Sequence, residues 1–213
     1  MRIFSQMMKL KIFNQNVVDI NSYLLIKEKE AILIDPGFNG DAIIEYLDES
    51  NVELKYIILT HGHFDHIRDI QILAKKYLFD VFISNQEVSF LKNDNQNYAF
   101  AFGSKFIFPK NIAVKSIKDE EKISLLDENF VFILTPGHTK GSMCIKYRNW
   151  LFSGDTIFYD SIGRTDLFSG SSLDMQKSLK YLKGRISNQT KIYPGHGKNG
   201  KWINIKDANS YIN

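Results

Sequence analysis

The five histidines of this 213-residue chain all follow short apolar runs that predict β-strands. Three of them lie in the segment HGHFDH at 61–66, directly after the apolar run KYIILT at 55–60. His138 follows the FVFIL run at 130–134, and His196 lies in the segment YPGHG at 193–197. Histidine is the commonest metal ligand, and no histidine is left for an ordinary surface or core position. The pattern therefore predicts a metal site, and the fold has to bring these strand ends together.

The spacing within the segment at 61–66 has a geometric basis. In an extended chain, residues two apart point to the same side, so His61 and His63 can converge on one ion. Asp65 and His66 fall where the chain turns into the next helix, where adjacent side chains diverge and can reach a second ion. Alternatively, Asp65 caps the helix and the two histidines are ordinary polar residues of a turn. The combination of all four within six residues favours the metal site.

A carboxylate, Asp155, ends the apolar run WLFSG at 150–154. On its own, such a residue can simply cap a loop. Two divalent cations close together require anionic ligands between them, so a carboxylate that bridges two ions is the better interpretation here. The sequence thus supplies seven candidate metal ligands: His61, His63, Asp65, His66, His138, Asp155 and His196.

Two basic residues are candidates for binding substrate. Arg164 lies in the GRTD segment at 163–166 and can hold an anionic substrate; a structural pair between Arg164 and Asp166 is the alternative. Lys140 lies two residues after His138, and its alternative is a solvated surface lysine. Asp35, which follows the run ILI at 32–34, is expected to bind backbone amides behind the metal loop.

The remaining pattern predicts two packed sheets covered by helices, an α/β layered sandwich. The helices are expected at Asp41–Leu47, Ile67–Tyr77 and Leu173–Leu182, with a short one from Lys206. The strands are expected at Met7–Phe13, Ser22–Lys27, Ala31–Asp35, Lys55–Thr60, Val81–Ser84, Lys122–Leu126, Phe130–Leu134, Met143–Tyr147, Trp150–Ser153 and Lys191–Tyr193. We expect a single domain over 1–213 with two similar halves, roughly 1–110 and 111–213. The aromatic segment at 98–108 either covers the core or lines the substrate pocket.

Composition limits the partners and the compartment. Hydrophobic residues make up 44% and charged residues 24% of the chain, as in ordinary globular proteins. The net charge of +3 is too weak for a nucleic-acid footprint. No apolar run approaches the about 20 residues of a membrane helix, and the N-terminus does not resemble a secretory signal. The single cysteine, Cys144, fits a reducing compartment and is expected to be buried. We therefore expect a cytoplasmic protein with neither nucleic-acid nor membrane partners.

These motifs together resemble those of the metallo-β-lactamase superfamily. The resemblance covers nearly the whole chain: DPG at 35–37, THGHFDH at 60–66, TPGHT at 135–139, GDT at 154–156, GRTD at 163–166 and GHG at 195–197. It is closest to the small proteins related to hydroxyacylglutathione hydrolase (glyoxalase II) and to persulfide dioxygenase.

The resemblance implies an αββα sandwich with metals at one edge between the sheets. It implies that His61, His63 and His138 hold one ion, that Asp65, His66 and His196 hold the second, and that Asp155 is shared. Glyoxalase II continues beyond this point into a helical domain that helps bind glutathione, and the chain ends too soon after His196 to hold it. Glutathione specificity is therefore not expected to be inherited.

These residues predict a dinuclear metal-dependent hydrolase, foremost a thioesterase that cleaves a small acyl thioester by metal-bound hydroxide. Paired divalent ions lower the pKa of a bridging water toward neutrality. Zinc is the expected metal, with iron or manganese as alternatives. Asp65 and Asp155 are the expected catalytic carboxylates, with Asp65 accepting or relaying a proton.

Two other functions stay open. A mononuclear iron persulfide dioxygenase would, by the resemblance, use His61, His138 and Asp155, a ligand set suited to iron(II) and oxygen. A non-catalytic metal-dependent binding module is the third. A secreted β-lactamase is disfavoured because no signal segment is visible. The acyl group, the thiol carrier and the oligomeric state are not determined by the sequence.

Overall fold

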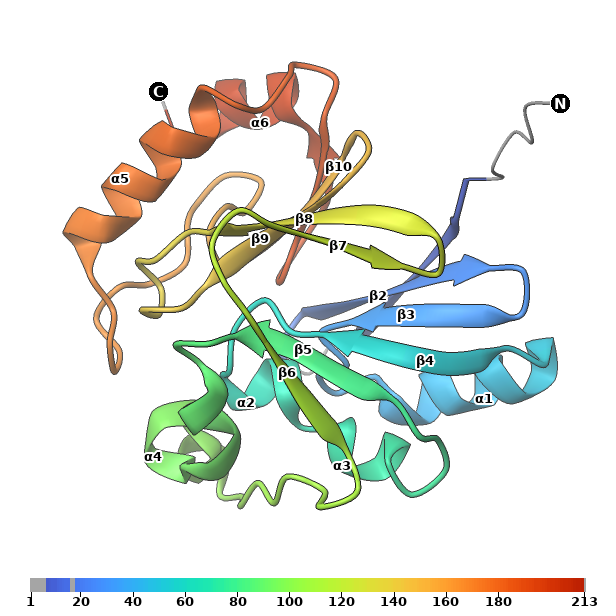
Figure 1. The fold of residues 1–213 in the computed structure, drawn as a ribbon. Coiled ribbons are helices and arrows are strands. Elements are labelled where there is room, and N and C mark those ends of the chain that lie inside the picture. The colour runs from blue at the N-terminus through green and yellow to red at the C-terminus, as the bar shows by residue number, and fades with distance from the viewer. Residues whose placement is uncertain (1–6, 16–17, 213) are drawn as a thin grey trace, which may run out of the picture.

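The computed structural model describes residues 7–15 and 18–212 of the chain. Within them, twelve strands form two six-stranded sheets, in the orders β1-β2-β3-β4-β5-β6 and β12-β11-β10-β9-β8-β7 (Figure 1). The first sheet comprises β1 Lys9–Gln15, β2 Ile20–Lys27, β3 Glu30–Ile34, β4 Glu53–Ile58, β5 Asp80–Ser84 and β6 Ala113–Ile117. The second comprises β7 Glu121–Leu125, β8 Glu128–Leu134, β9 Met143–Tyr147, β10 Trp150–Gly154, β11 Lys191–Pro194 and β12 Gly200–Lys201. The chain passes from one sheet to the other at 118–120.

Both sheets are mixed. In the first, β1, β2 and β3 are antiparallel neighbours, and β3 to β6 run parallel to one another. In the second, β10 and β11 are parallel and the other neighbours antiparallel. Because parallel neighbours need a crossover, the connections between them carry the helices.

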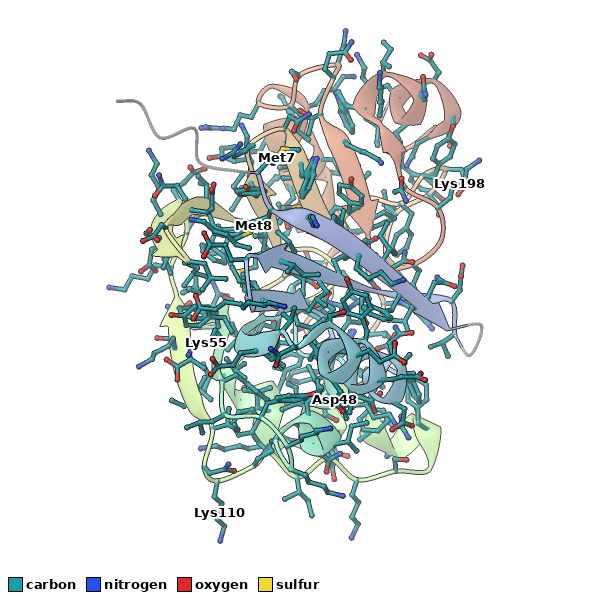
Figure 2. The ribbon with its side chains drawn as sticks, turned by 90° about the vertical axis from the view of Figure 1, so that its right-hand side faces the viewer. Met7, Met8, Asp48, Lys55, Lys110 and Lys198 are labelled. Atoms are coloured by element: carbon teal, nitrogen blue, oxygen red, sulfur yellow. The ribbon has the colours of Figure 1, made fainter. Side chains whose placement is uncertain are left out.

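The helices cover the two outer faces of the pair of sheets (Figure 1). The first sheet is covered by α1 Gly40–Ser50, α2 Phe64–Ile67, α3 Ile70–Leu73 and α4 Asp94–Asn97, with the 3₁₀ helices η1 Val88–Lys92 and η2 Ala99–Phe102 flanking α4. The second is covered by α5 Ser172–Lys183 and α6 Trp202–Ala208. Figure 2 shows the same stacking from the side, with the loop that carries Lys110 at the opposite end of the molecule from α5 and α6. The expected αββα sandwich is confirmed.

Three apolar layers hold the sandwich together, and adjacent residues of one strand enter different layers. In β2, Leu24 packs with α1 and α3, whereas Leu25 packs between the sheets. In β9, Ile145 packs between the sheets, whereas Cys144 packs with α5 and α6. Because both faces of the central strands are covered, these strands contain apolar runs, which made them visible in the sequence. Cys144 is buried as expected, and burial raises its pKa to about 11.

The helix expected at Ile67–Tyr77 is wrong, because the chain forms the two short helices α2 and α3 instead. The backbone between them pairs with the Asp35-Pro36-Gly37 turn: the Gly37 N–H donates to the His66 carbonyl, and the Asp69 N–H donates to the Gly37 carbonyl, each at 3.1 Å. The buried Asp69 carboxylate also accepts the Gly40 N–H at 2.7 Å. These bonds compete with a continuous helix and fix α2 beside the turn.

Other differences are smaller. The last helix, α6, begins at Trp202, before the expected start at Lys206. α1 begins one residue before Asp41, with Asn39 as its N-cap. The edge strands β6 and β12 were not expected. None of the helices within the described residues is long and apolar enough to span a membrane.

Candidate metal centre

The seven candidate ligands come from the carboxyl ends of four strands in two sheets. The loop after β4 carries His61 and His63, and α2 carries Asp65 and His66. His138 follows β8 and belongs to the second sheet. The other two ligands follow the parallel pair β10 and β11: Asp155 comes directly after β10, and His196 comes shortly after β11. The sandwich therefore brings both halves of the chain to one point.

The ligand atoms form three overlapping groups in which all atoms lie within 4.8 Å of one another. The groups are His61, His63 and His138; His61, His66 and Asp155; and Asp65, His66 and His196. The first and third are the two ligand sets that the family resemblance implies. The second places Asp155 beside a histidine of each set.

The first set is buried and arranged with its inner nitrogens close together. His63 Nδ1 lies 2.8 Å from His138 Nε2. In two of the rings, the nitrogen that faces away from the other ligands has a polar partner outside the centre. His61 Nδ1 lies 3.2 Å from the Thr60 hydroxyl, and His138 Nδ1 lies 2.7 Å from the Arg164 carbonyl oxygen. Such outer partners fix a ring so that the other nitrogen can bind an ion. Nitrogens bound to one tetrahedral zinc lie about 3.3 Å apart, so these positions are close to those of ligands.

The second set has the same construction. His66 Nδ1 lies 2.9 Å from Asp35 Oδ2, and His196 Nδ1 lies 2.8 Å from the Val18 carbonyl oxygen. The inner Nε2 of His196 lies 3.3 Å from Asp65 Oδ2. Asp35 also accepts the Thr60 N–H at 2.8 Å, so it supports the metal loop from behind as expected.

The Asp155 carboxylate lies between the two sets. Its Oδ1 is 3.3 Å from His66 Nε2, and its Oδ2 is 3.4 Å from His138 Nε2 and 3.6 Å from His196 Nε2. The neighbouring Gly195 leaves room for this carboxylate, because a Cβ there would overlap Asp155 Oδ1 and the His66 ring. Asp155 can therefore contribute one oxygen to each of two ions.

Several buried polar atoms of the centre have no hydrogen-bond partner, and they are of the kinds that bind cations. His61 Nε2, His66 Nε2 and Asp155 Oδ1 are buried and have no hydrogen-bond partner. A buried polar atom without a partner costs about 1–3 kcal/mol. Three such atoms at one point, backed by oriented rings, are satisfied together when divalent ions bind.

Burial keeps His61 and His63 neutral. Burial lowers the pKa of His63 to about 3 and holds that of His61 well below its ordinary value. Neutral imidazole is the form that binds metal.

The carboxylates create a strongly negative environment around the second set. Burial alone would lower the pKa of His66, but Asp155, Asp35 and Asp65 outweigh it and raise that pKa well above its ordinary value. Burial alone would raise the pKa of Asp155, but His196, His66 and His138 hold it well below its ordinary value. The second set is therefore a place that attracts positive charge.

The two basic candidates lie outside this group. The Arg164 guanidinium makes two 2.7 Å hydrogen bonds to Asp166, the structural pair left open by the sequence, and both side chains are exposed. The Lys140 ammonium lies 6.0 Å from the ring centroid of Phe90, and its backbone N–H donates to Ser169 Oγ. A role for either side chain in binding substrate stays a prediction.

One supporting residue, Glu87, was not anticipated. Its buried carboxylate accepts the Gly62 N–H at 3.0 Å and the Gly141 N–H at 2.9 Å. It thereby ties the loop of His61 and His63 to the loop after His138. Burial raises the pKa of Glu87 to about 6. The only sequence signal was an acid shortly after a buried strand.

Comparison with known proteins agrees with this geometry. A family model described as the metallo-beta-lactamase superfamily matches residues 16–196. The probable metallo-hydrolase MJ0888 of Methanocaldococcus jannaschii is 38% identical over 199 residues, covering 90% of this chain and 94% of that protein. Hydroxyacylglutathione hydrolase 1 of Vibrio vulnificus is 32% identical over 183 residues, covering 85% of this chain and 64% of that protein.

Among solved structures, the B3 metallo-beta-lactamase BLEG-1 matches with a TM-score of 0.88 and 28% identity, covering 96% of this chain and 99% of that one. The family match covers most of the chain and includes all seven candidate ligands. The chain therefore belongs to the metallo-beta-lactamase superfamily, and the names of its relatives support a metal-dependent hydrolase.

Proposed function

We propose that this protein is a dinuclear metal-dependent hydrolase that cleaves a small acyl thioester. The observation that carries the proposal is the position of Asp155, whose two carboxylate oxygens lie 3.3 to 3.6 Å from histidines of both ligand sets. A carboxylate in this position suits two ions better than one. The similarity to a hydroxyacylglutathione hydrolase supports a thioester as the substrate.

Divalent ions bound here would supply a water of lowered pKa and a Lewis acid for the carbonyl oxygen. Zinc is the proposed metal. The chain itself contributes the ligands and a proton acceptor. Asp65 is more exposed than Asp155, at 19% against 9% for the side chains, and it lies beside His196, at the more open side of the centre. We assign Asp65 to take the proton of the attacking water.

The reaction balances without a further reagent. The water oxygen forms a bond to the carbonyl carbon, and the carbon–sulfur bond breaks to release a carboxylic acid and a thiol. Because a thiol has a pKa of about 8.5, its thiolate leaves without a strong general acid. The weak net charge and the single buried cysteine support a small-molecule substrate and a cytoplasmic location.

A second candidate is a mononuclear iron persulfide dioxygenase. Two distances support it. His138 Nε2 lies 3.4 Å from Asp155 Oδ2, and the ring centroids of His61 and His138 lie 4.8 Å apart. Two histidines and one carboxylate form the ligand set of many iron(II) oxygenases.

Metal content and turnover, measured on the same preparation, separate these functions. Protein purified without added metal is loaded with zinc, manganese or iron(II). It is then assayed for thiol release from acetyl and lactoyl thioesters, for oxygen uptake with glutathione persulfide, and for cleavage of a chromogenic β-lactam. We expect thiol release by protein that holds two ions. Oxygen uptake with one iron and no thiol release would overturn the proposal in favour of the dioxygenase, and metal binding with no turnover would favour a binding module.

A further inference from the structure

Two segments near the metal centre carry exposed phenylalanine side chains. Within the described residues, the exposed phenylalanines are Phe100, Phe102 and Phe168, at 55%, 40% and 44%. The first two belong to η2 and the third follows the GRTD segment at 163–166. The chain has sixteen phenylalanines, and most of those that the structure describes are buried or half-buried. Grouped exposed aromatic residues mark a binding surface.

Tyr98 joins these two segments and lies against the metal centre. Its ring packs edge-to-face on the ring of His63, with centroids 5.4 Å apart, and Phe100 lies 5.5 Å from it. Its hydroxyl oxygen accepts the Phe168 N–H at 2.7 Å. Phe168 in turn packs against Phe90 at 5.9 Å. Phe90 also lies beside His63, with ring centroids 6.2 Å apart. Two series of ring contacts therefore start at this metal ligand: one runs through Tyr98 to Phe100, and the other runs through Phe90 to Phe168. The half-buried or exposed rings at 98, 100 and 168 are called the aromatic wall.

Tyr98 has an unusual backbone conformation, which several other residues of the chain share. Tyr98 ends α4 with a φ of 63°, in the left-handed region that glycine adopts without cost. A bulky residue in this region is strained, and the contacts of its side chain offset that strain. A glycine would lose the ring contacts with His63 and Phe100 and the hydroxyl that accepts the Phe168 N–H.

The Lys140 ammonium lies near the aromatic wall, 6.0 Å from the ring centroid of Phe90. The nearby Arg164 is paired with Asp166 through two hydrogen bonds, so its guanidinium faces a carboxylate. Exposed phenylalanine rings favour hydrocarbon over a hydroxyl or a carboxylate, since a polar group there would lose its bonds to water.

We infer that Tyr98, Phe100 and Phe168 form an acyl-binding wall, and that the preferred substrates are thioesters with a hydrocarbon acyl chain rather than short hydroxyacyl thioesters. This inference rests on the proposed thioester hydrolysis. The acyl chain lies along the rings while its carbonyl group reaches the metal centre beside His63.

The test is the dependence of kcat/KM on acyl length. The substrates are acetyl, butyryl, hexanoyl and lactoyl thioesters of N-acetylcysteamine, so that the thiol is constant. A buried methylene contributes up to about fourfold in binding. We expect kcat/KM to rise at least about tenfold from acetyl to hexanoyl, mainly through a lower KM, and butyryl to exceed lactoyl.

Variants assign the effect to the wall. Phe168→Ala and Phe100→Ala should flatten the dependence on acyl length, whereas Phe168→Leu should keep most of it. Tyr98→Phe should keep the preference because the ring remains, and Tyr98→Ala should lose it. Ile107→Ala is the matched control, since Ile107 is 72% exposed and lines a separate groove with Phe108 and Lys110.

The outcomes distinguish the two proposals. No hydrolysis of any thioester by the metal-loaded wild type would overturn the thioesterase function itself. Hydrolysis that is equal across the acyl series, faster with lactoyl than with butyryl, or equally length-dependent in Phe168→Ala and Phe100→Ala would overturn the acyl-binding wall and leave the thioesterase standing.

Discussion

At the scale of single residues, the centre depends on carboxylates that hold charge between histidines. Among the candidate ligands, Asp155 has oxygens near Nε2 atoms of both ligand sets. Asp35 acts behind the centre, where it holds His66 Nδ1 and the Thr60 backbone. The two carboxylates therefore have different tasks: one contacts the ions and the other orients a ligand.

Replacing Asp155 with alanine should abolish turnover and keep the fold. The change removes the shared anion, so two cations would repel each other, and we expect loss of the second ion and at least about a hundredfold lower kcat/KM. The measurement is metal content and thioester hydrolysis, with circular dichroism to check folding. Asp160→Asn, at an exposed position after β10, is the matched control. Wild-type activity and metal content in Asp155→Ala would refute the bridging role.

Replacing Arg164 with alanine should have a small effect. Its guanidinium is exposed and held by Asp166, and it is the Arg164 backbone carbonyl that orients His138. Exposed ion pairs contribute little, so we expect less than about a threefold change in KM for both a carboxylate-bearing and a neutral thioester. A much larger rise in KM for the carboxylate-bearing substrate alone would show that Arg164 leaves Asp166 to bind anions.

At the scale of elements, the loops that carry ligands are held by residues from other segments. Glu87 follows β5 and accepts one N–H from each of two ligand loops, at Gly62 and Gly141. It therefore couples β4, β5 and β8 at the carboxyl ends of their strands. A Cβ on Gly62 would overlap the Phe90 side chain, which packs next to it.

Glu87→Ala should destabilise the protein by about 2–4 kcal/mol, because it leaves two buried N–H groups without an acceptor. Urea unfolding of the metal-free protein measures this directly, with the exposed α1 variant Glu45→Gln as control. The same substitution should weaken metal binding, since both ligand loops lose their common anchor. A loss of stability below about 0.5 kcal/mol would mean that other contacts hold the loops.

The elements visible in the sequence were those with long apolar runs. β2, β8 and β9 are mostly buried and each contains an apolar run, so they were predicted. β6 was missed because it is an edge strand whose residues are mostly exposed. The helix expected at Ile67–Tyr77 was wrong because distant backbone bonds to Gly37, which local periodicity does not reveal, divide it.

The same contrast applies to the site. All seven candidate ligands lie in short motifs at strand ends, so local sequence identified them. Glu87 and Tyr98 act through contacts with segments far along the chain, and only the fold reveals those contacts.

At the scale of the whole molecule, the metal centre joins the two halves of the sandwich. In the first half, the loop after β4 supplies His61 and His63, and α2 supplies Asp65 and His66. In the second half, the segments after β8, β10 and β11 supply the other three ligands, His138, Asp155 and His196. The apolar layer between the sheets holds the halves together, and bound ions would add bonds across one edge of that layer.

Metal loading should therefore raise thermal stability. With free zinc at about a thousand times its dissociation constant, the gain is about 4 kcal/mol. For a chain of this size, this corresponds to a rise in Tm of about 8–16 °C. Calorimetry of chelator-treated and zinc-loaded protein measures the shift, and Asp155→Ala should reduce it. An unchanged Tm would mean that ions do not bind the folded state through these residues.

The number of ions per chain tests the dinuclear centre most directly. Protein stripped with a chelator and reloaded with zinc is examined by native mass spectrometry together with elemental analysis. His196→Ala removes one ligand of the second set and serves as the partner measurement. The account predicts two ions per wild-type chain and one in His196→Ala. A fully loaded wild-type protein with a single ion, unchanged by His196→Ala, would contradict it.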